Sequence, residues 1–158
     1  MEPMPQKDPN RKTYPPVTEI GRDEHVGMVR EIFATITGRY DFLNRLLSLR
    51  RDVAWRRFAV RKMRFFKTFR LLDVATGTAD LAIEAVRRHP GIQVMGIDFV
   101  REMLAAGRQK IATRGLVDRI RLLQADALML PFPDGSFDAA GIAFGIRNMP
   151  DRLRALRE

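Results

Sequence analysis

Residues 71–81, with the sequence LLDVATGTADL, decide the fold of this chain. The apolar run before Asp73 is typical of a buried strand, and the small residues after it predict a tight turn that leads into a helix. A second apolar run ends at Gly96-Ile97-Asp98 and predicts another strand that stops at a carboxylate. In open α/β sheets, ligands bind beyond the carboxyl ends of the strands, where small residues let the backbone approach them. We therefore expect a ligand site near Asp73 and Asp98.

The side chains around this turn indicate which ligand it suits. The G-x-G-x-x-G pattern that holds a dinucleotide pyrophosphate is missing, and carboxylates stand at Asp73, Asp80 and Asp98 instead. These carboxylates would repel a pyrophosphate, whereas they suit a ligand that carries a ribose and a cation. Asp98 is placed to accept hydrogen bonds from both ribose hydroxyls. S-adenosylmethionine, with a sulfonium, an ammonium and no phosphate, fits this description; a tight turn that binds nothing is the ordinary alternative.

The composition is that of one soluble globular domain, with 46% hydrophobic and 30% charged residues among 158. The chain has no cysteine, which excludes disulfides, thiolate metal sites and cysteine nucleophiles. No metal site is expected, because His25 and His89 follow no ligand spacing, and His89, just before Pro90-Gly91, is expected to be a solvated helix end. The N-terminus lacks the apolar core of a signal peptide, which favours a cytoplasmic location.

The formal net charge of +9 favours an anionic partner. Residues 45–70 contain ten Arg or Lys and a single acid, Asp52. The segment also contains five aromatic residues: Trp55, Phe58, Phe65, Phe66 and Phe69. One interpretation is a solvated helix face with core aromatics behind it. The other is a basic, aromatic surface that lies peripherally on an anionic membrane. Nucleic acid is a third partner class, which we do not expect.

The chain divides into three segments. Residues 1–17 contain five prolines and predict a disordered tail. Residues 18–68 predict N-terminal helices, from 23 to 37, after Asp41 and after Asp52. Residues 69–158 alternate between predicted strands and helices, which indicates an α/β domain with a parallel, doubly wound, Rossmann-like sheet. The strands are expected at 69–74, 92–97, 120–124 and 137–144, and the helices at 80–88, 101–113 and from about 151.

Crossover handedness and a switch point beside the first strand predict the strand order 3-2-1-4. The fourth strand would then lie at the edge, although residues 139–146, AAGIAFGI, are apolar and uncharged. Such a strand is a poor edge. We therefore expect the sheet to be truncated after strand four, with further strands, a partner chain or both covering it, and expect the isolated chain to have little activity.

These segments together resemble the ubiquinone/menaquinone biosynthesis C-methyltransferases, which are class I S-adenosylmethionine-dependent enzymes. The resemblance runs from about Val26 to Glu158 and is most specific in RYDFLNRLLSL (39–49) and FGIRN (144–148). DVATGTAD (73–80), GID (96–98) and LPFPD (130–134) also match. The chain departs from the family's usual residues at Arg50, Ala79 and Ala143. The family continues past this point into further strands, so the chain resembles the N-terminal part of the enzyme.

The resemblance implies the substrate and the site. A prenylated quinol, either demethylmenaquinol or 2-methoxy-6-polyprenyl-1,4-benzoquinol, would receive a methyl group on carbon. Asp98 would hold the ribose of S-adenosylmethionine. The other cofactor-binding residues would be Asp73 and Gly77, Thr78 near the methionine end, Asp126 and the backbone of Ala127 at the adenine, and Tyr40 packed nearby.

The candidate catalytic residues follow the fourth strand. Methyl transfer from a sulfonium is an in-line displacement, so the protein must align the ring carbon with the methyl group and exclude water. The ring proton must then leave. Arg147, which stays protonated, would stabilise a phenolate, and Asn148 would fix a water. The ordinary alternative for this pair is a cap on the next helix, and His25 is a second candidate base.

Three other functions stay open at this point. A class I methyltransferase that acts on RNA would suit the positive charge. A cofactor-binding fragment without activity would suit a chain that resembles only the N-terminal part of the family. A hydride-transfer enzyme is the least expected, because the pyrophosphate motif is missing.

Overall fold

The computed structural model describes residues 27–29, 31–32, 35, 48 and 51–158. The predictions for the tail 1–17, for His25, for Tyr40 and for the helix after Asp41 lie outside these residues. Of the helix expected at 23–37, residues 27–29, 31–32 and 35 are described and are helical. The elements that follow are α2 (Arg51–Lys62), β1 (Arg70–Val74), α3 (Asp80–Arg88), β2 (Gln93–Asp98), α4 (Arg101–Ala112), β3 (Ile120–Gln124), β4 (Ala139–Ile142), the 3₁₀ helix η2 (Ile146–Asn148) and α5 (Arg152–Arg157).

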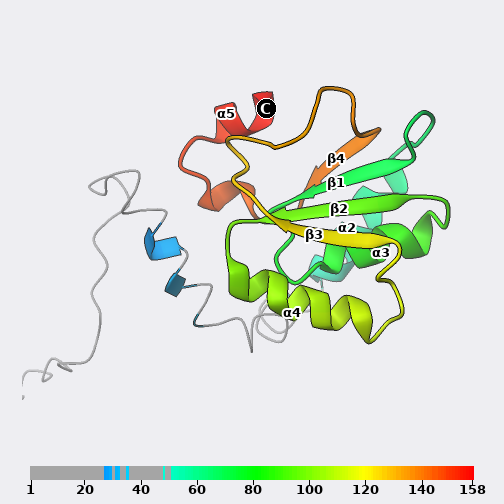
Figure 1. Cartoon of the computed structure of the whole chain (residues 1–158), viewed down its shortest axis with the longest axis horizontal. Helices are drawn as coiled ribbons and strands as arrows, with labels where there is room; N and C mark the ends of the chain where they lie inside the picture. Colours follow the sequence, from blue (N-terminus) through cyan, green and yellow to red (C-terminus); the bar gives the residue numbers. More distant parts are fainter. Residues whose placement is uncertain (1–26, 30, 33–34, 36–47, 49–50) are drawn as a thin grey trace, which may run out of the picture.

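The four strands form one parallel sheet in the order β3-β2-β1-β4, as predicted (Figure 1). Asp73 lies opposite Gly96 of β2 and Gly141 of β4, while Asp98 lies opposite Gln124 of β3. Because all four strands run in the same direction, their carboxyl ends share one edge of the sheet. Asp73 and Asp98 are therefore brought to that edge.

The connections between the strands explain the layers. Right-handed crossovers from β1 to β2 and from β2 to β3 run in the same direction, so they place α3 and α4 on the same face of the sheet. Figure 1 shows α2 with them on that side. The chain returns from β3 to β4 through residues 125–138, where Phe132 and Phe137 line a groove together with Leu72 and Val74 of β1.

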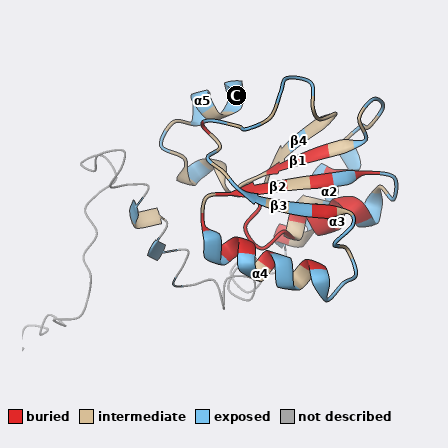
Figure 2. Cartoon of the chain, viewed as in Figure 1, coloured by how far each residue is buried: buried red, intermediate tan, exposed pale blue. Residues whose placement is uncertain are grey.

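The core lies between this helical layer and the central strands. Leu71 of β1, Val94 of β2 and Ile83 of α3 belong to one buried cluster (Figure 2). The burial follows the sequence pattern, because α3 has an apolar stripe and the central strands are apolar runs. This packing fixes the start of α3, and with it the turn that leads into the helix.

The basic helix α2 begins at Arg51, so Asp52 lies in its first turn and not before it. The Ser48 hydroxyl donates to Asp52 Oδ1 at 2.7 Å. Burial of Asp52 is outweighed by this hydrogen bond and by the charge of Arg56, which together lower the pKa of Asp52. The buried Asp52 carboxylate is thus held ionised in the first turn of α2.

The aromatic residues of this region do not form a core behind α2. Four of them are at least half exposed: Trp55, Phe58, Phe66 and Phe69. Phe65 is the exception, since its ring packs edge-to-face with the His89 ring, with 5.0 Å between the ring centroids. The expectation that His89 is solvated is wrong, because its Nε2 also lies 3.0 Å from the Val60 carbonyl oxygen. The interpretation as core aromatics therefore fails for the four exposed rings.

Strand β4 is shorter than predicted because the residues that flank it in the sequence make other contacts or turn away from the sheet. The Asp138 carboxylate accepts hydrogen bonds from the backbone N–H groups of residues 66–69, at 2.8–3.1 Å. These bonds outweigh slight desolvation and lower the pKa of Asp138 to about 2. At the other end, Phe144 adopts a left-handed φ of 65° and the chain turns into η2. The helix expected near Asp151 is present as α5, with Asp151 as its N-cap.

Candidate functional site

The turn between β1 and α3 is held in an unusual backbone conformation. Ala75, Gly77 and Ala79 have φ values of 52°, 55° and 66°. This left-handed region is easy for glycine but strained for alanine, so the surroundings must hold the turn in place. The Thr76 N–H donates to the Ile97 carbonyl oxygen at 2.9 Å, which ties the turn to the end of β2.

Asp73 lies beneath this turn with an incompletely satisfied carboxylate. Its Oδ2 accepts hydrogen bonds from Thr76 Oγ1 at 2.6 Å and from the Ala82 N–H at 3.2 Å. Its Oδ1 is buried and has no hydrogen-bond partner in the part of the chain that the structure describes. Burial raises the pKa of Asp73 to about 7, and the negative charge of Asp98 adds to this effect. Asp73 is therefore a buried acid that ionises reluctantly.

Asp98 is the acid that faces the ligand side of the sheet edge. Its Oδ2 accepts from the Gly77 N–H at 2.8 Å and its Oδ1 from the Val100 N–H at 2.9 Å. Burial raises the pKa of Asp98, while hydrogen bonding from the backbone of Val100, Gly77 and Phe99 opposes the rise. Each carboxylate oxygen can accept a second hydrogen bond. Asp98 is thus oriented by the backbone and can still accept two donors.

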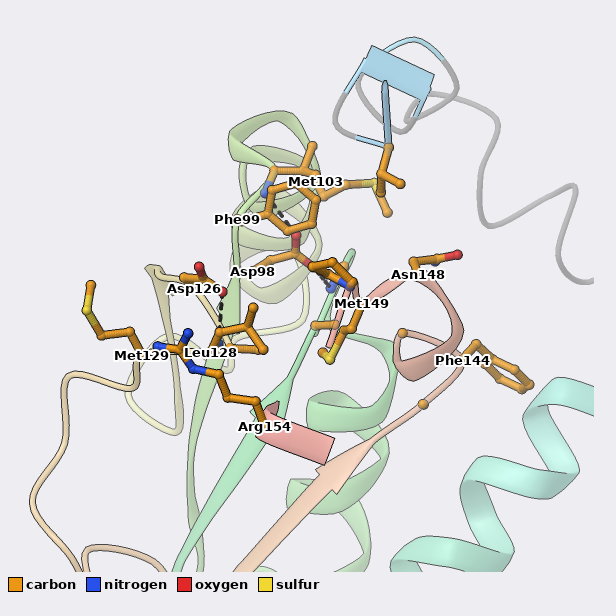
Figure 3. Close-up of a pocket in the computed structure, with 18 residues that line it drawn as sticks. Asp98, Phe99, Met103, Asp126, Leu128, Met129, Phe144, Asn148, Met149 and Arg154 are labelled. Atoms are coloured by element: carbon orange, nitrogen blue, oxygen red, sulfur yellow. Dashed lines mark hydrogen bonds between the residues drawn. The ribbon is translucent and has the colours of Figure 1, made fainter. Parts of the chain in front are cut away.

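A cavity of about 410 Å³ opens beside Asp98. Figure 3 shows its lining, which comes from the ends of β2 and β3, from the start of α4 and from the segment after β4. Phe99, Met103 and Met149 give the cavity apolar walls, and Asp98 and Asp126 are its acidic residues. Asp126 is exposed, and its Oδ1 accepts from the Leu128 N–H at 2.8 Å. An apolar cavity with two carboxylates at the sheet edge suits a ribonucleoside with a cationic tail.

Five of the residues singled out from the sequence line this cavity: Gly77, Asp98, Asp126, Ala127 and Asn148. Asp73 lies under the turn and does not line it. Thr78 is buried and turned away, because its hydroxyl accepts a hydrogen bond from Lys110 Nζ at 2.8 Å. Arg147 is exposed on η2 and is outside the lining as well.

Sequence reasoning missed several lining residues, among them Val29, Met103, Met149 and Arg154. Met103 had a usable signal, since it falls in the first turn of the helix that follows Asp98. No sequence signal pointed to Met149 and Arg154, because their position in the cavity lining depends on how η2 and α5 fold back over the sheet edge. No group of three His, Asp or Glu in the described part of the chain is arranged to hold a metal ion.

The comparisons with known proteins agree with this geometry. The chain is 53% identical over 127 residues to a demethylmenaquinone methyltransferase of Thermus thermophilus, which covers 80% of the chain and 57% of the relative. It is 48% identical over 131 residues to a ubiquinone/menaquinone biosynthesis C-methyltransferase of Geotalea uraniireducens, which covers 82% of the chain and 56% of the relative. The chain thus spans little more than half the length of these curated relatives.

A solved structure of a SAM-dependent methyltransferase from Aquifex aeolicus shares the fold, with a TM-score of 0.57 over 65% of the chain and 55% of that structure. At 22% identity this likeness concerns the fold alone. The family model of the ubiE/COQ5 methyltransferases matches residues 19–158. The chain therefore belongs to the ubiE/COQ5 methyltransferase family.

Proposed function

We propose that this chain provides the cofactor site of an enzyme that methylates a prenylated quinol on carbon with S-adenosylmethionine. The observation that carries the proposal is Asp98, fixed by two backbone N–H groups at the mouth of an apolar cavity, with acceptor capacity left for two hydroxyls. The family membership supports it, because the relatives are named for quinone methylation. The choice between a benzoquinol and a naphthoquinol stays open in this proposal.

The cofactor would lie along the sheet edge. Asp98 would accept hydrogen bonds from the two ribose hydroxyls, and Asp126 with the Ala127 backbone would contact the adenine. The methionine end would reach toward the turn at Gly77, whose missing side chain leaves the backbone accessible. Asp73 and Thr78 would act from behind the turn, Asp73 by its negative charge and Thr78 by its hydrogen bond with Lys110.

S-adenosylmethionine supplies an electrophilic methyl group on its sulfonium. In the proposed reaction the ring carbon would take this methyl group, with the carbon–carbon bond forming as the carbon–sulfur bond breaks and its electron pair stays on sulfur, and the ring proton would depart to water. The residues of the chain would align the ring and exclude bulk water. Asn148, which lines the cavity, would orient the ring hydroxyl or a water. We assign Arg147, exposed on η2, the stabilisation of a phenolate once the substrate covers it.

The prenyl chain of such a substrate lies in a membrane, so we propose that α2 and the loop after it contact an anionic bilayer surface. The exposed rings of Trp55, Phe58, Phe66 and Phe69 support this, since they lie among exposed Arg and Lys residues. None of the helices in the described ranges is long and apolar enough to cross a membrane. The contact would therefore be peripheral.

Binding to anionic vesicles should weaken as salt rises, because screening shortens the reach of each surface charge. Phe66→Ala should weaken vesicle binding further, since Phe66 is 77% exposed and can be removed without loss of core. Leu153→Ala is the matched control, at 68% exposure outside this region. Cosedimentation measures both effects. Equal binding to neutral and anionic vesicles would exclude the proposed surface, and salt-sensitive RNA binding without vesicle binding would favour an RNA substrate.

A hybrid enzyme tests the proposed reaction. In it, these 158 residues replace the matching segment of the T. thermophilus demethylmenaquinone methyltransferase. The hybrid should transfer a labelled methyl group from S-adenosylmethionine to a demethylmenaquinol analogue. Asn148→Ala in the hybrid should lower kcat by roughly 100- to 1,000-fold, the range for loss of one positioned hydrogen-bonding side chain. A folded hybrid that binds the cofactor and never methylates the quinol would contradict the proposal.

A further inference from the structure

Arg56 of α2 is a nearly buried guanidinium held between two carboxylates. Its side chain is 10% exposed, and its Nη2 donates to Asp52 Oδ2 and, at 3.2 Å, to Asp80 Oδ2. Asp52 belongs to α2 itself, whereas Asp80 is the first residue of α3. A charge at this depth is tolerated only when it is paired. Arg56 therefore joins α2 to the start of α3.

The contact extends into the strained turn. Lys110 of α4 donates from Nζ to Asp80 Oδ1 and to Thr78 Oγ1, both at 2.8 Å. Ala79, which lies between these two anchored residues, is fully buried and has the left-handed φ of 66°. Strained residues persist only where the surroundings fix them. Arg56 and Lys110 supply such a constraint, because Arg56 binds Asp80 Oδ2 and Lys110 binds Asp80 Oδ1.

The same guanidinium reaches the other wall of the cavity. Its Cζ lies 5.9 Å from the ring centroid of Phe144, a residue that lines the cavity, and the Trp55 ring is also 5.9 Å from that ring. Figure 3 shows the Phe144 ring directed toward α2. Cation–π and aromatic contacts of this kind hold a ring in place. Arg56 thus contacts both the turn after β1 and the loop after β4.

We propose that Arg56 is a positioning residue, which sets the spacing between the turn 75–80 and the loop 144–148 on either side of the ligand. It touches no substrate and acts through Asp80 and Phe144. The inference takes the identity of the ligand from the proposed function, but the positioning itself concerns the ligand-free fold. It gives α2 a second role beside its exposed, basic surface.

Arg57 offers a matched comparison. It follows Arg56 on the same helix and also joins α2 to α3, with its Nε 3.5 Å from Glu84 Oε1, but its side chain is 63% exposed and Glu84 lies away from the cavity. Arg56→Gln and Arg57→Gln therefore remove the same charge from neighbouring positions. A general effect of charge or of helix contact would appear in both variants, whereas positioning of the site would appear in the first alone.

Amide hydrogen exchange on the ligand-free chain makes the comparison. The Gly77 amide donates to the Asp98 carboxylate. The amides of Ala79 and Asn148 donate to the carbonyl oxygens of Thr76 and Gly145, within the turn and the loop. In Arg56→Gln their exchange should accelerate roughly 3- to 30-fold, the range for coupling between neighbouring segments. In Arg57→Gln the change should stay below about twofold, as for an exposed pair. Arg56→Lys keeps the charge but lacks the planar fork, so it should recover only part of the protection.

Calorimetry with S-adenosylmethionine is the second arm. Arg56→Gln and Asp80→Asn should each weaken binding roughly 3- to 30-fold. In the double variant the loss of affinity should be smaller than the product of the two single losses, because both substitutions remove the same interaction. Equal exchange and equal affinity in Arg56→Gln and Arg57→Gln would overturn the inference. If Arg56→Gln does not fold, Arg56→Lys and Asp80→Asn decide by the same comparison. If the unaltered chain binds no S-adenosylmethionine but the exchange difference appears, the positioning role stands and the proposed function fails.

Discussion

Replacing Asp98 with alanine should weaken the binding of S-adenosylmethionine by roughly 30- to 150-fold. The loss corresponds to about 2–3 kcal/mol for a pair of charge-assisted hydrogen bonds to the ribose. Asp98 is suited to this role because Gly77 and Val100 already orient its two oxygens from the backbone. Isothermal titration calorimetry on Asp98→Ala, with the exposed Asp118→Ala as the control, measures the effect.

The ligand provides a second control, since Asp98 also supports the turn through Gly77. For a 2′,3′-dideoxy analogue of the cofactor, the same substitution should have a much smaller effect, because the hydroxyls that Asp98 would bind are gone. Equal losses for the two ligands would mean that Asp98 acts only on the turn. Unchanged affinity for S-adenosylmethionine would remove Asp98 from the site altogether.

Replacing Asp73 with asparagine should remove a pH dependence of stability. Burial raises the pKa of Asp73 to about 7 from an ordinary value of 3.8. Between these two pH values, Asp73 is therefore protonated in the folded chain and ionised in the unfolded chain. The free energy of unfolding should then fall as pH rises from about 4 to 7 and stay low above, by at most about 4 kcal/mol. Asparagine cannot ionise. The stability of Asp73→Asn, measured relative to the unaltered chain, should therefore be higher at pH 8 than at pH 4.5.

Urea denaturation at pH 4.5, 6 and 8 tests this expectation, with the exposed Asp118→Asn as the matched control. If Asp73→Asn keeps the full pH dependence of the unaltered chain, the reluctant ionisation of Asp73 does not contribute to it. The proposed ligand would change the ionisation of Asp73. A sulfonium and an ammonium near the turn would favour the ionised carboxylate, which burial disfavours in the ligand-free fold.

The sheet was predictable from the sequence because its signals are local. Helix α3 and strand β3 have the expected bounds, and the order 3-2-1-4 follows from crossover handedness and a switch point beside β1. The position of Asp98 was equally predictable, since a carboxylate that ends a strand of a parallel sheet lies at the carboxyl edge of that sheet. The predicted ligand residues that face the cavity are those at strand ends or in the turn backbone.

Other features depend on contacts that a sequence pattern does not contain. Thr78 was expected to face the cofactor, but the left-handed residues on both sides of it turn its hydroxyl toward Lys110. Strand β4 was expected to be longer, but the Asp138 side chain binds the loop at 66–69. Arg56 was one of ten basic residues in a segment, and its role depends on Asp80, a residue 24 positions away.

The central claim is that the cavity beside Asp98 holds S-adenosylmethionine, and a nuclear magnetic resonance titration tests it most directly. Adding the cofactor or S-adenosylhomocysteine to the ¹⁵N-labelled chain should shift the amide signals of Gly77, Val100 and Ala127, which border the cavity at the ends of three strands. NADH, whose pyrophosphate the carboxylates should repel, should leave these signals in place at the same concentration. Signals that stay unshifted at saturating cofactor, or that move only with NADH, would contradict the assignment of this site.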